Sequence, residues 1–552
     1  MIAGELRAQV QAWIDDEVDP AAATELLTLL AATGDLPVTQ APPSAQRRKI
    51  DAEQAGAELA DRFSGPLMFG TAGLRGPLRA GPNGMNRAVV RRAAAGLAAW
   101  LIAQGRAGAP VVVGYDGRHG SHAFAEDSAA IFAAAGFDTR LLPRLLPTPL
   151  VAFAVRHLGA AAGVMVTASH NPPQDNGYKV YAGDGAQIVP PTDTEIESAI
   201  QSVGPTQEIL LAPQGFSVLD ESIVEAYVGA VAALAGDGPR SVRIVHTALH
   251  GVGTEVVRRV FAAAGFAPLL AVAQQEQPDA DFPTVAFPNP EEPGALDLAF
   301  ALARAEQADV IIANDPDADR CAIATPLPGG EWRMLRGDEV GVLLADALLR
   351  KGVRGTYATT IVSSTMLRAM TKRNGAGYAE TLTGFKWIAR AAPDLVYGYE
   401  EALGYAVAPD LVRDKDGISA ALLVAELVAA LKAQGSSLQQ RLDELAAEYG
   451  RYETDQASIR VDDLTIISAT MARLRARPPA TLLGEAVTVT DLLPAADVVR
   501  LTWPSGRVVV RPSGTEPKLK VYLEIVLAEG PASTAATRLA LLHKEISAAL
   551  GI

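Results

Sequence analysis

The sequence predicts an α/β protein of several domains that ends in a smaller α+β domain. Short apolar strands, polar loops and amphipathic helices alternate through most of the chain, an order that is typical of α/β domains. Near the C-terminus, apolar and polar residues alternate strictly, which is typical of an antiparallel sheet. Because 552 residues are too many for one compact core, we expect three or four domains.

The N-terminal part begins with predicted helices. An amphipathic pattern from Leu6 to Leu30 predicts one helix, and the proline-containing residues 37–43 end this appendage. A second amphipathic pattern predicts a helix from Arg87 to Gln104. The apolar run Pro110–Gly114 predicts a short buried strand, and Ala123–Ala135 is expected to form the helix that follows it.

The same order returns further along the chain. Three more apolar strands are each expected to lead into a polar loop: Val242–His246, Ala308–Ala313 and Asp394–Tyr399. Near the C-terminus, Arg507–Val510 predicts a strand, and Lys518–Ile525 predicts a half-exposed strand with apolar residues on one face. Ser533–Leu550 is expected to form a closing helix.

Composition excludes several classes of protein. The net charge of −15 argues against nucleic acid as a partner, because its binding needs a basic face. A single cysteine, Cys321, cannot form a disulfide within the chain, which fits the reducing cytosol. The N-terminus has no apolar signal core, and the apolar stretch Ser419–Leu431 carries Glu426 and is too short to span a bilayer. We therefore expect a cytoplasmic protein with no membrane partner.

The loop Thr167–Pro172 places Ser169 directly after the apolar run Ala161–Val166. A buried strand that ends in a polar, proline-stopped turn presents a side chain at the edge of a sheet, where open α/β folds bind ligands. A lone serine in a loop carries little weight. A hydrolase that pairs Ser169 with His170 is disfavoured, because adjacent side chains rarely face each other and no nucleophile elbow is present.

Three aspartates, Asp315, Asp317 and Asp319, follow a predicted buried strand at alternate positions. In an extended segment they point the same way, and each pair at 4–6 Å costs about 3–4 kcal/mol at an effective dielectric constant of 20. A hard divalent cation such as Mg²⁺ is the natural partner. A calcium loop is excluded because Arg320 stands where its turn needs glycine, and a solvated acidic turn stays open as an alternative.

Two further loops carry polar side chains suited to a sugar phosphate. Arg511 offers a planar fork for phosphate oxygens, and the residues after it add hydroxyl donors and a possible anion nest: Ser513, Gly514 and Thr515. An ordinary turn with an exposed arginine is the alternative. Glu400 and Glu401 follow a predicted strand and could accept sugar hydroxyls, although adjacent glutamates usually mark a solvated surface.

Other candidates are weaker by themselves. The glycine-rich loop Gly70–Gly76 carries Arg75 and is either a flexible turn or a phosphate loop of close backbone approach; it matches neither a Walker loop nor a dinucleotide fingerprint. Lys179 could bring an amine beside Ser169, or it could be an exposed lysine on a strand. The metal-like spacing of two histidines, His246 and His250, is rejected because nearby glycines break a helix there.

Together the four loops resemble the α-D-phosphohexomutase superfamily, in order and in spacing, from about Phe69 to the C-terminus. The resemblance is nearest to the phosphoglucomutase-2/phosphopentomutase-like branch, through Gly70–Gly76, Thr383–Trp387 and Asp414–Gly417. It implies three α/β domains around mixed sheets and a C-terminal α+β domain, with the active site in a central cleft. We expect a phosphoglucomutase; phosphopentomutase, phosphomannomutase, sugar-bisphosphate synthase and a sugar-phosphate-binding regulatory protein are the alternatives.

The resemblance also implies roles for residues. Ser169 carries a phosphate, and one of its oxygens joins the three aspartates in holding Mg²⁺. Lys179 is the candidate general base, with His170 and Arg75 nearby, provided that neighbouring cations lower its pKa. The expected substrate-binding residues are Arg320, Gly384, Lys386, Glu400, Glu401, Lys415, Arg511, Ser513, Gly514 and Thr515. A sugar bisphosphate is the expected intermediate and activator, and monomer and homodimer both stay open.

Two positions depart from the family pattern. Ala402 stands where many phosphoglucomutases have serine, and Gly514 where some hexomutases have asparagine, so the expected hexose contacts differ. The predicted division of the chain is an N-terminal helical appendage followed by domains that carry the serine, metal, sugar and phosphate loops: 1–43, 44–212, 213–327, 328–447 and 448–552.

Overall fold

The structure is a computed structural model, and it describes residues 3–34, 51–70, 73–461, 463–513 and 518–551. The chain divides into two compact units. Unit 1 comprises residues 1–332 and 405–429, and unit 2 comprises residues 333–404 and 430–552. The five-part division expected from the sequence is finer than these units and stays a prediction.

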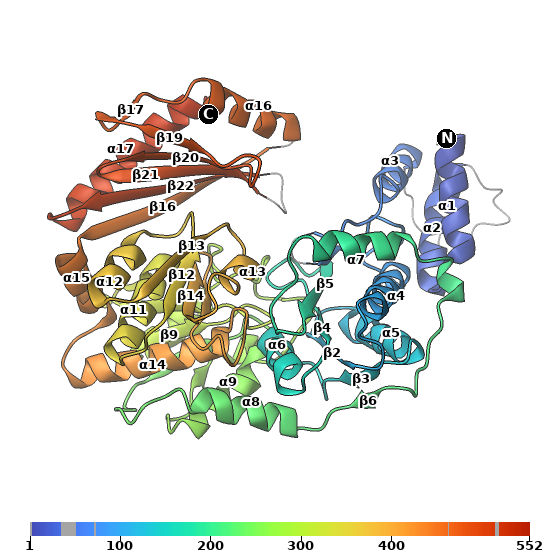
Figure 1. Cartoon of the computed structure of the whole chain (residues 1–552), viewed down its shortest axis with the longest axis horizontal. Helices are drawn as coiled ribbons and strands as arrows, with labels where there is room; N and C mark the ends of the chain where they lie inside the picture. Colours follow the sequence, from blue (N-terminus) through green and yellow to red (C-terminus); the bar gives the residue numbers. More distant parts are fainter. Residues whose placement is uncertain (1–2, 35–50, 71–72, 462, 514–517, 552) are drawn as a thin grey trace. The chain divides into compact units, whose positions relative to one another are not determined.

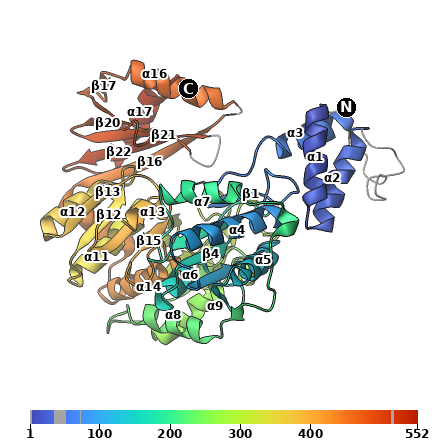
Figure 2. The same cartoon turned by 45° about the vertical axis from the view of Figure 1, so that its right-hand side comes forward.

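Unit 1 begins with three helices, α1 (Gly4–Asp16), α2 (Pro20–Ala32) and α3 (Ala52–Arg62). The prediction of one helix from Leu6 to Leu30 is therefore wrong. Pro20 has no N–H to donate and begins α2, while the Asp19 side chain accepts a hydrogen bond from Ala21 N at 2.9 Å. The three helices pack side by side around a small apolar core (Figures 1 and 2). The prolines expected to end the appendage lie outside the described residues.

The first sheet of unit 1 has the strand order β1-β5-β4-β2-β3-β6. Its strands are β1 (Leu74–Pro77), β2 (Pro110–Tyr115), β3 (Asp138–Leu141), β4 (Ala162–Val166), β5 (Asp175–Ala182) and β6 (Ser217–Val218). Strands β4, β2, β3 and β6 run parallel, whereas β5 is antiparallel to β4 and to β1. Four helices accompany this sheet: α4 (Arg87–Ala103), α5 (Ser121–Ala134), α6 (Thr148–His157) and α7 (Thr192–Gln201).

The second sheet has the order β11-β10-β9-β7-β8 and is also mixed. Its strands are β7 (Ile244–Thr247), β8 (Leu270–Ala271), β9 (Val310–Ala313), β10 (Ala322–Pro326) and β11 (Trp332–Met334). Helices α8 (Ser222–Ala232), α9 (Gly253–Ala263) and α10 (Asp297–Ala305) belong to the same region. Helix α14 (Gly417–Ala433) starts in unit 1, where a Cβ on Gly417 would lie 2.2 Å from the carbonyl oxygen of Arg320. Only glycine permits this close approach.

Unit 2 contains a sheet of order β13-β12-β14-β15 in which β12 (Thr356–Thr360) runs parallel to β13 (Gly377–Thr381) and β14 (Leu395–Glu400). Strand β15 (Gly404–Ala406) lies where the chain passes to unit 1. The helices of this part are α11 (Gly337–Arg350), α12 (Met366–Asn374), α13 (Phe385–Ile388) and α15 (Leu438–Tyr449).

The C-terminal part of unit 2 is an antiparallel sheet of order β16-β22-β21-β20-β19. Its strands are β16 (Arg451–Arg460), β19 (Thr488–Asp491), β20 (Val499–Trp503), β21 (Gly506–Pro512) and β22 (Lys518–Leu527), and a short hairpin adds β17 (Thr481–Leu482) and β18 (Glu485–Ala486). Helices α16 (Leu464–Ala476) and α17 (Ala532–Leu550) cover one face of this sheet (Figure 1). This α+β arrangement confirms the predicted fold class.

One expectation for β22 is wrong. The polar face of this strand was predicted to be exposed, but Tyr522 is only 5% exposed and Glu524 only 2%. Both side chains pack within unit 2, Tyr522 against Ile361 and Val362, and Glu524 against the residues that follow them. The alternation correctly identified the strand, but both of its faces are covered.

No helix in the described part of the chain is by itself long and apolar enough to cross a membrane; α14 and α15 meet the length and composition criteria only as a pair bent by 89°.

Candidate active site

Ser169 lies on the loop between β4 and β5, at the carboxyl end of a fully buried strand. Its φ of 51° is in the left-handed region, a conformation that costs a non-glycine residue about 1–2 kcal/mol. The side chain of Thr167 holds the turn by accepting a hydrogen bond from Ser169 N at 2.9 Å. The Ser169 hydroxyl donates to Asp315 Oδ2 at 2.9 Å, which joins the loops of the two sheets of unit 1.

Arg118 holds the loop that carries Ser169 in place through hydrogen bonds to its backbone. Its guanidinium donates to four backbone carbonyl oxygens, those of Ser169, Asn171, Pro172 and Asp175, at 2.6–3.2 Å. The arginine is buried and its charge is offset by Asp116, whose carboxylate also accepts from Arg118 N at 3.0 Å. Arg118 thus fixes the path of the backbone that presents Ser169.

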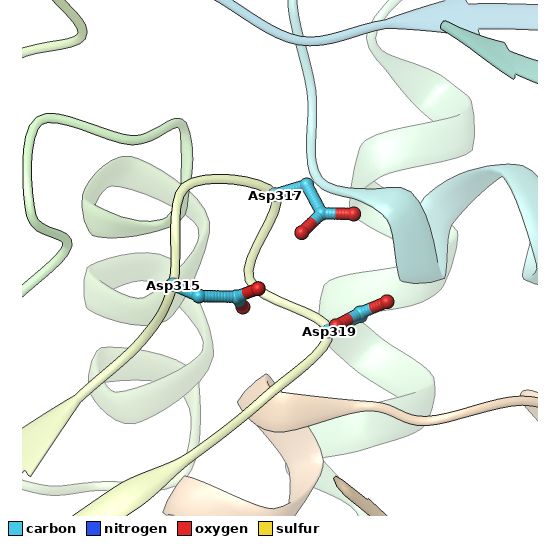
Figure 3. Close-up of side chains that lie close together, drawn as sticks. All are labelled: Asp315, Asp317 and Asp319. Carbon is cyan, nitrogen blue, oxygen red and sulfur yellow. The ribbon is translucent and has the colours of Figure 1, made fainter. Parts of the chain in front are cut away.

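Asp315, Asp317 and Asp319 project from the loop between β9 and β10 toward the same side (Figure 3). Each is fully buried, and one oxygen from each lies within 4.8 Å of the others. The convergence agrees with the sequence, but the segment is a turn with Ala318 in the left-handed region at φ 54°, and not an extended strand. Asn314 closes the loop by donating from Nδ2 to the Arg320 carbonyl oxygen at 2.7 Å, and His246 contacts Asn314 Oδ1 at 3.0 Å.

The pKa values of Asp315 and Asp319 are shifted by burial and by the charges around them. Burial raises the pKa of the Asp315 carboxyl well above its ordinary value, and the charges of Asp317 and Asp319 raise it further. Burial acts in the same direction on Asp319, but nearby cations outweigh it and lower the pKa of Asp319 below its ordinary range. Those cations are Lys179, Lys415 and Arg320. The cluster therefore lies among positive charges that partly neutralise it.

Lys179 comes from β5 and is buried, so it is not an exposed lysine on a strand. Its Nζ lies 2.7 Å from Asp317 Oδ2 and 2.9 Å from Asp319 Oδ2. Burial lowers the pKa of this ammonium group, but the two carboxylates more than offset the effect, and the net pKa lies above its ordinary value. Lys415 lowers this pKa, as a general base would require, but the two carboxylates outweigh it in the arrangement seen here.

His170 and Arg75 also lie beside Ser169. His170 Nδ1 is 3.2 Å from the Ser169 hydroxyl, contrary to the expectation that adjacent side chains do not face each other. Burial, with the charges of Arg320 and Arg75, lowers the pKa of His170 well below its ordinary value, so the imidazole is neutral at pH 7. Arg75, on β1, donates to Asn171 Oδ1 at 3.2 Å.

The glycine-rich loop before Arg75 approaches β5 closely. A Cβ on Gly73, whose φ is 84°, would lie 1.8 Å from the carbonyl oxygen of Tyr178. This supports close backbone approach over a flexible turn for Gly73. Residues 71 and 72 of the loop lie outside the described residues.

Lys415 and Thr148, both in unit 1, also contact the loop that carries the three aspartates. Lys415 Nζ is 3.4 Å from Asp319 Oδ2 and 3.6 Å from Asp414 Oδ1. Asp414 in turn accepts from Tyr181 Oη at 2.9 Å and from Gln187 Nε2 at 2.7 Å. Thr148, at the start of α6, donates to Asp317 Oδ2 at 2.5 Å. Arg320 completes the group, with Nε 4.0 Å from Asp315 and 3.9 Å from Asp319.

The expected sugar-binding residues lie in unit 2. Glu400 ends β14, and Glu401 accepts from the hydroxyl groups of Ser363 at 3.0 Å and Thr360 at 3.3 Å. The next turn packs tightly, because a Cβ on Gly337 would lie 1.9 Å from the carbonyl oxygen of Glu401. Gly384 precedes α13 with a φ of 111°, and the buried Lys386 Nζ lies 5.3 Å from the ring centroid of Trp387.

Arg511, at the end of β21, is also in unit 2. Tyr522 lies beside both Arg511 and Glu401: burial raises the pKa of its phenol, Glu401 raises it further, and Arg511 opposes the shift. The sugar loop and the start of the phosphate loop are therefore neighbours within unit 2. Ser513 N donates to the carbonyl oxygen of Lys518 at 2.7 Å, while Gly514 and Thr515 lie outside the described residues.

The three aspartates fit a bound cation. Asp317 Oδ1 and Asp319 Oδ1 are buried and have no hydrogen-bond partner in the part of the chain that the structure describes. Buried carboxylate oxygens without a donor are costly, and an all-oxygen set of this kind suits Mg²⁺. A metal ion could therefore be held by Asp315, Asp317 and Asp319.

Sequence reasoning missed the residues that support the loops. Four such residues form hydrogen bonds with partners that are distant in the sequence, by up to 169 residues: Arg118, Asn314, Thr148 and Ser363. A usable signal existed for Arg118 and for Asn314, since each follows a predicted strand.

Comparison with known proteins covers most of the chain. Models of phosphoglucomutase/phosphomannomutase alpha/beta/alpha domains I, II and III match residues 66–206, 225–329 and 336–449, and the model of the C-terminal domain of the same family matches residues 460–539. A "Probable phosphomannomutase" from Haemophilus influenzae is 47% identical over 454 residues, 80% of this chain and 93% of that protein. "Phosphopentomutase" from Mus musculus is 36% identical over 541 residues, 86% of each chain.

A solved structure supports the fold. The open form of pp63/parafusin, a phosphoglucomutase from Paramecium, has a TM-score of 0.70 and 20% sequence identity, and the match covers 89% of this chain and 96% of that one. The full set of domain matches and the identity to the Haemophilus and mouse proteins go beyond a shared fold. This chain belongs to the phosphoglucomutase/phosphomannomutase family of the α-D-phosphohexomutase superfamily, and it is a phosphosugar mutase.

Proposed function

We propose that this mutase moves a phosphoryl group between C1 and the terminal hydroxyl of a glucose phosphate, through a phosphorylated Ser169 and a sugar bisphosphate. The carrying observation is the 2.9 Å contact between the Ser169 hydroxyl and Asp315. It places the candidate nucleophile against the carboxylate cluster that fits a metal ion. Phosphoryl transfer needs this juxtaposition, because its catalysis is mostly positioning and charge neutralisation.

The residues of unit 1 take the chemical roles. Asp315, Asp317 and Asp319 would hold Mg²⁺ together with an oxygen of the Ser169 phosphate. The ion, when bound, would neutralise charge on the transferring phosphoryl oxygens. Arg320, close to Asp315 and Asp319, adds a second positive charge on the same side. Arg75 and the neutral His170 flank the serine and orient its phosphate.

Lys179 is the proposed general base. A cation held by the aspartates would offset the negative charge that raises the pKa of Lys179 and would favour the neutral amine. Lys179 then accepts the proton of the sugar hydroxyl that attacks the phosphorus on Ser169, and the Ser169 oxygen leaves. The resulting sugar bisphosphate turns end for end and returns its other phosphoryl group to Ser169.

The remaining residues of the proposed site recognise the substrate. Glu400 and Glu401 accept sugar hydroxyls, and Arg511, Ser513, Gly514 and Thr515 bind the phosphate that does not react. Lys386, Gly384 and Lys415 complete the set proposed to bind substrate. A central cleft that unites the residues of the two units stays a prediction.

The decisive test is Ser169→Ala with intact-mass measurement. The wild-type protein should carry about 80 Da on Ser169, lose it on addition of a sugar monophosphate, and isomerise that sugar; Ser169→Ala should do neither. Full turnover by Ser169→Ala ends the proposed mechanism. A kcat/KM panel of glucose, mannose, ribose and deoxyribose 1-phosphates then identifies the substrate.

A second candidate is phosphopentomutase, favoured by Ala402 and by the mouse relative of that name. A higher kcat/KM for ribose or deoxyribose 1-phosphate than for glucose 1-phosphate in the same panel establishes it. Release of sugar bisphosphate as the main product indicates a bisphosphate synthase instead. The cytoplasmic location and the choice between monomer and homodimer belong to the proposal, and size-exclusion chromatography with light scattering decides the latter.

A further inference from the structure

The loop Ile361–Thr365, which joins β12 to α12 in unit 2, contacts both the sugar loop and the C-terminal sheet. No sequence pattern singled it out. Its first four residues are buried, and Ser363 is only 1% exposed. We call it the β12–α12 loop. Ser363 lies beside Glu401, which is proposed to bind the sugar.

Ser363 makes two contacts with Glu401. Its hydroxyl donates to Glu401 Oε2 at 3.0 Å and accepts from Glu401 N at 3.2 Å. Thr360 adds a second contact to the same carboxylate oxygen at 3.3 Å, and the Thr360 and Ser363 hydroxyl groups lie 2.8 Å apart. Among the described residues, the two hydroxyl groups that contact the Glu401 carboxylate, those of Thr360 and Ser363, both contact Oε2.

The β12–α12 loop is itself held firmly by two buried, oppositely charged side chains of the C-terminal sheet. Arg507 donates to the carbonyl oxygen of Ile361 at 2.9 Å and also contacts that of Ser363. Glu524, paired with Arg507 at 2.8 Å, accepts from Ser364 Oγ at 2.9 Å and from Thr365 N at 2.7 Å. The serine that contacts Glu401 thus stands on a fixed support.

A glutamate side chain at a loop has several rotamers, and ordering it at the moment of binding reduces affinity. Hydrogen bonds that fix one carboxylate oxygen remove this freedom and aim the other oxygen in a set direction. We propose that Ser363 is a positioning residue that fixes Glu401 through Oε2, so that Oε1 accepts a sugar hydroxyl. The proposal rests on the role of Glu401 in the proposed function.

This role would also account for recognition despite Ala402. The hydroxyl groups that order the glutamate come from the neighbouring strand end, 38 and 41 residues before Glu401, and not from within the sugar loop. Substrate binding then depends on Ser363 in addition to the residues that touch the sugar.

The test compares Ser363→Ala with Ser364→Ala, kinetically and in a double-mutant cycle with Glu401→Ala. Both serines are buried and each gives one hydroxyl bond to a carboxylate, but Ser364 bonds to Glu524. Ser363→Ala should raise KM for the preferred sugar 1-phosphate by about fivefold to thirtyfold with kcat within about twofold, the range expected for a lost buried hydrogen bond. Ser364→Ala should leave KM unchanged, and in the Glu401→Ala background, which has no acceptor for the Ser363 hydroxyl, the effect of Ser363→Ala should vanish.

Equal KM values for the two serine variants overturn the proposal, and so does an effect of Ser363→Ala that persists without the Glu401 carboxylate. Either result with an active, phosphorylated wild-type protein leaves the proposed function intact. A wild-type protein that neither carries phosphate on Ser169 nor isomerises any sugar 1-phosphate overturns both.

Discussion

Lys179 Nζ lies 2.7 Å from Asp317 Oδ2, although 138 residues separate the two in the sequence. The contact joins a strand of the first sheet of unit 1 to the aspartate loop of the second sheet. Together with the bond between Ser169 and Asp315, it assembles the proposed chemical centre from two sheets within one unit. The positive charge of Lys179 offsets part of the negative charge that a cation bound by the aspartates would neutralise.

Magnesium should stabilise the protein through the aspartates. At a free Mg²⁺ concentration 100-fold above Kd, binding to the folded state alone adds about 2.7 kcal/mol to the free energy of unfolding. We expect Asp317→Asn to remove most of the Mg²⁺-dependent rise in Tm. The matched control is Asp281→Asn, an exposed aspartate of unit 1 that contacts His119, which should keep the full rise. A normal rise in Asp317→Asn contradicts the proposed metal site.

Arg118→Lys should disturb the serine loop without removing the positive charge. A lysine cannot bridge the four carbonyl oxygens that Arg118 contacts, so Ser169 shifts from its position. Displacement by about 1 Å lowers rates on the order of 100-fold, and we expect a fall of that size in kcat. The rise in Tm with Mg²⁺ should persist, since the aspartate loop keeps its own contacts. Arg140→Lys, a partly exposed arginine of β3, is the control and should retain kcat.

Asp338→Asn should change how stability depends on pH. Burial raises the pKa of this carboxyl from 3.8 to about 7, and the charges of Glu401 and Glu524 add to the shift. The folded state therefore binds the proton more tightly than the unfolded state, so the contribution of Asp338 to stability is complete below pH 3.8 and is lost as pH rises through about 7. The loss amounts to about 4 kcal/mol at most.

An asparagine keeps the acceptor for Ser364 N and Tyr399 Oη but does not ionise. Relative to the wild-type protein, Asp338→Asn should gain stability between pH 4 and pH 7, as measured by urea unfolding at several pH values. The exposed control Asp497→Asn should follow the wild-type profile. Parallel profiles for Asp338→Asn and the wild type show that the carboxyl does not titrate in this range.

Arg507→Met should destabilise unit 2 by about 3–5 kcal/mol, because it leaves the Glu524 carboxylate buried without its cation. Arg475→Met breaks surface ion pairs with Asp491 and Asp497 and should cost much less, because water screens exposed pairs. Urea unfolding measures both, and hydrogen exchange should show faster exchange in β21 and β22 of Arg507→Met only. Equal costs for the two variants mean that the buried pair adds no special stability.

The sequence by itself determined the elements and the loops between them. Apolar runs identified strands β2, β4, β7, β9 and β14, and the alternation at Lys518–Ile525 identified β22. The spacing of Asp315, Asp317 and Asp319 predicted their convergence, although the reason assumed was an extended segment and the structure has a turn. These features depend on residues within a few positions of one another, so local patterns are sufficient to predict them.

The tertiary structure alone decided which side chains support the loops, which faces are covered and which charges meet. The burial of Glu524, the raised pKa of Lys179 and the contact of Ser363 with Glu401 all depend on packing that the patterns did not capture. Burial and pKa depend on the atoms that surround a group in space, and most of those atoms come from residues tens to hundreds of positions away. One sequence without its fold does not specify those distances.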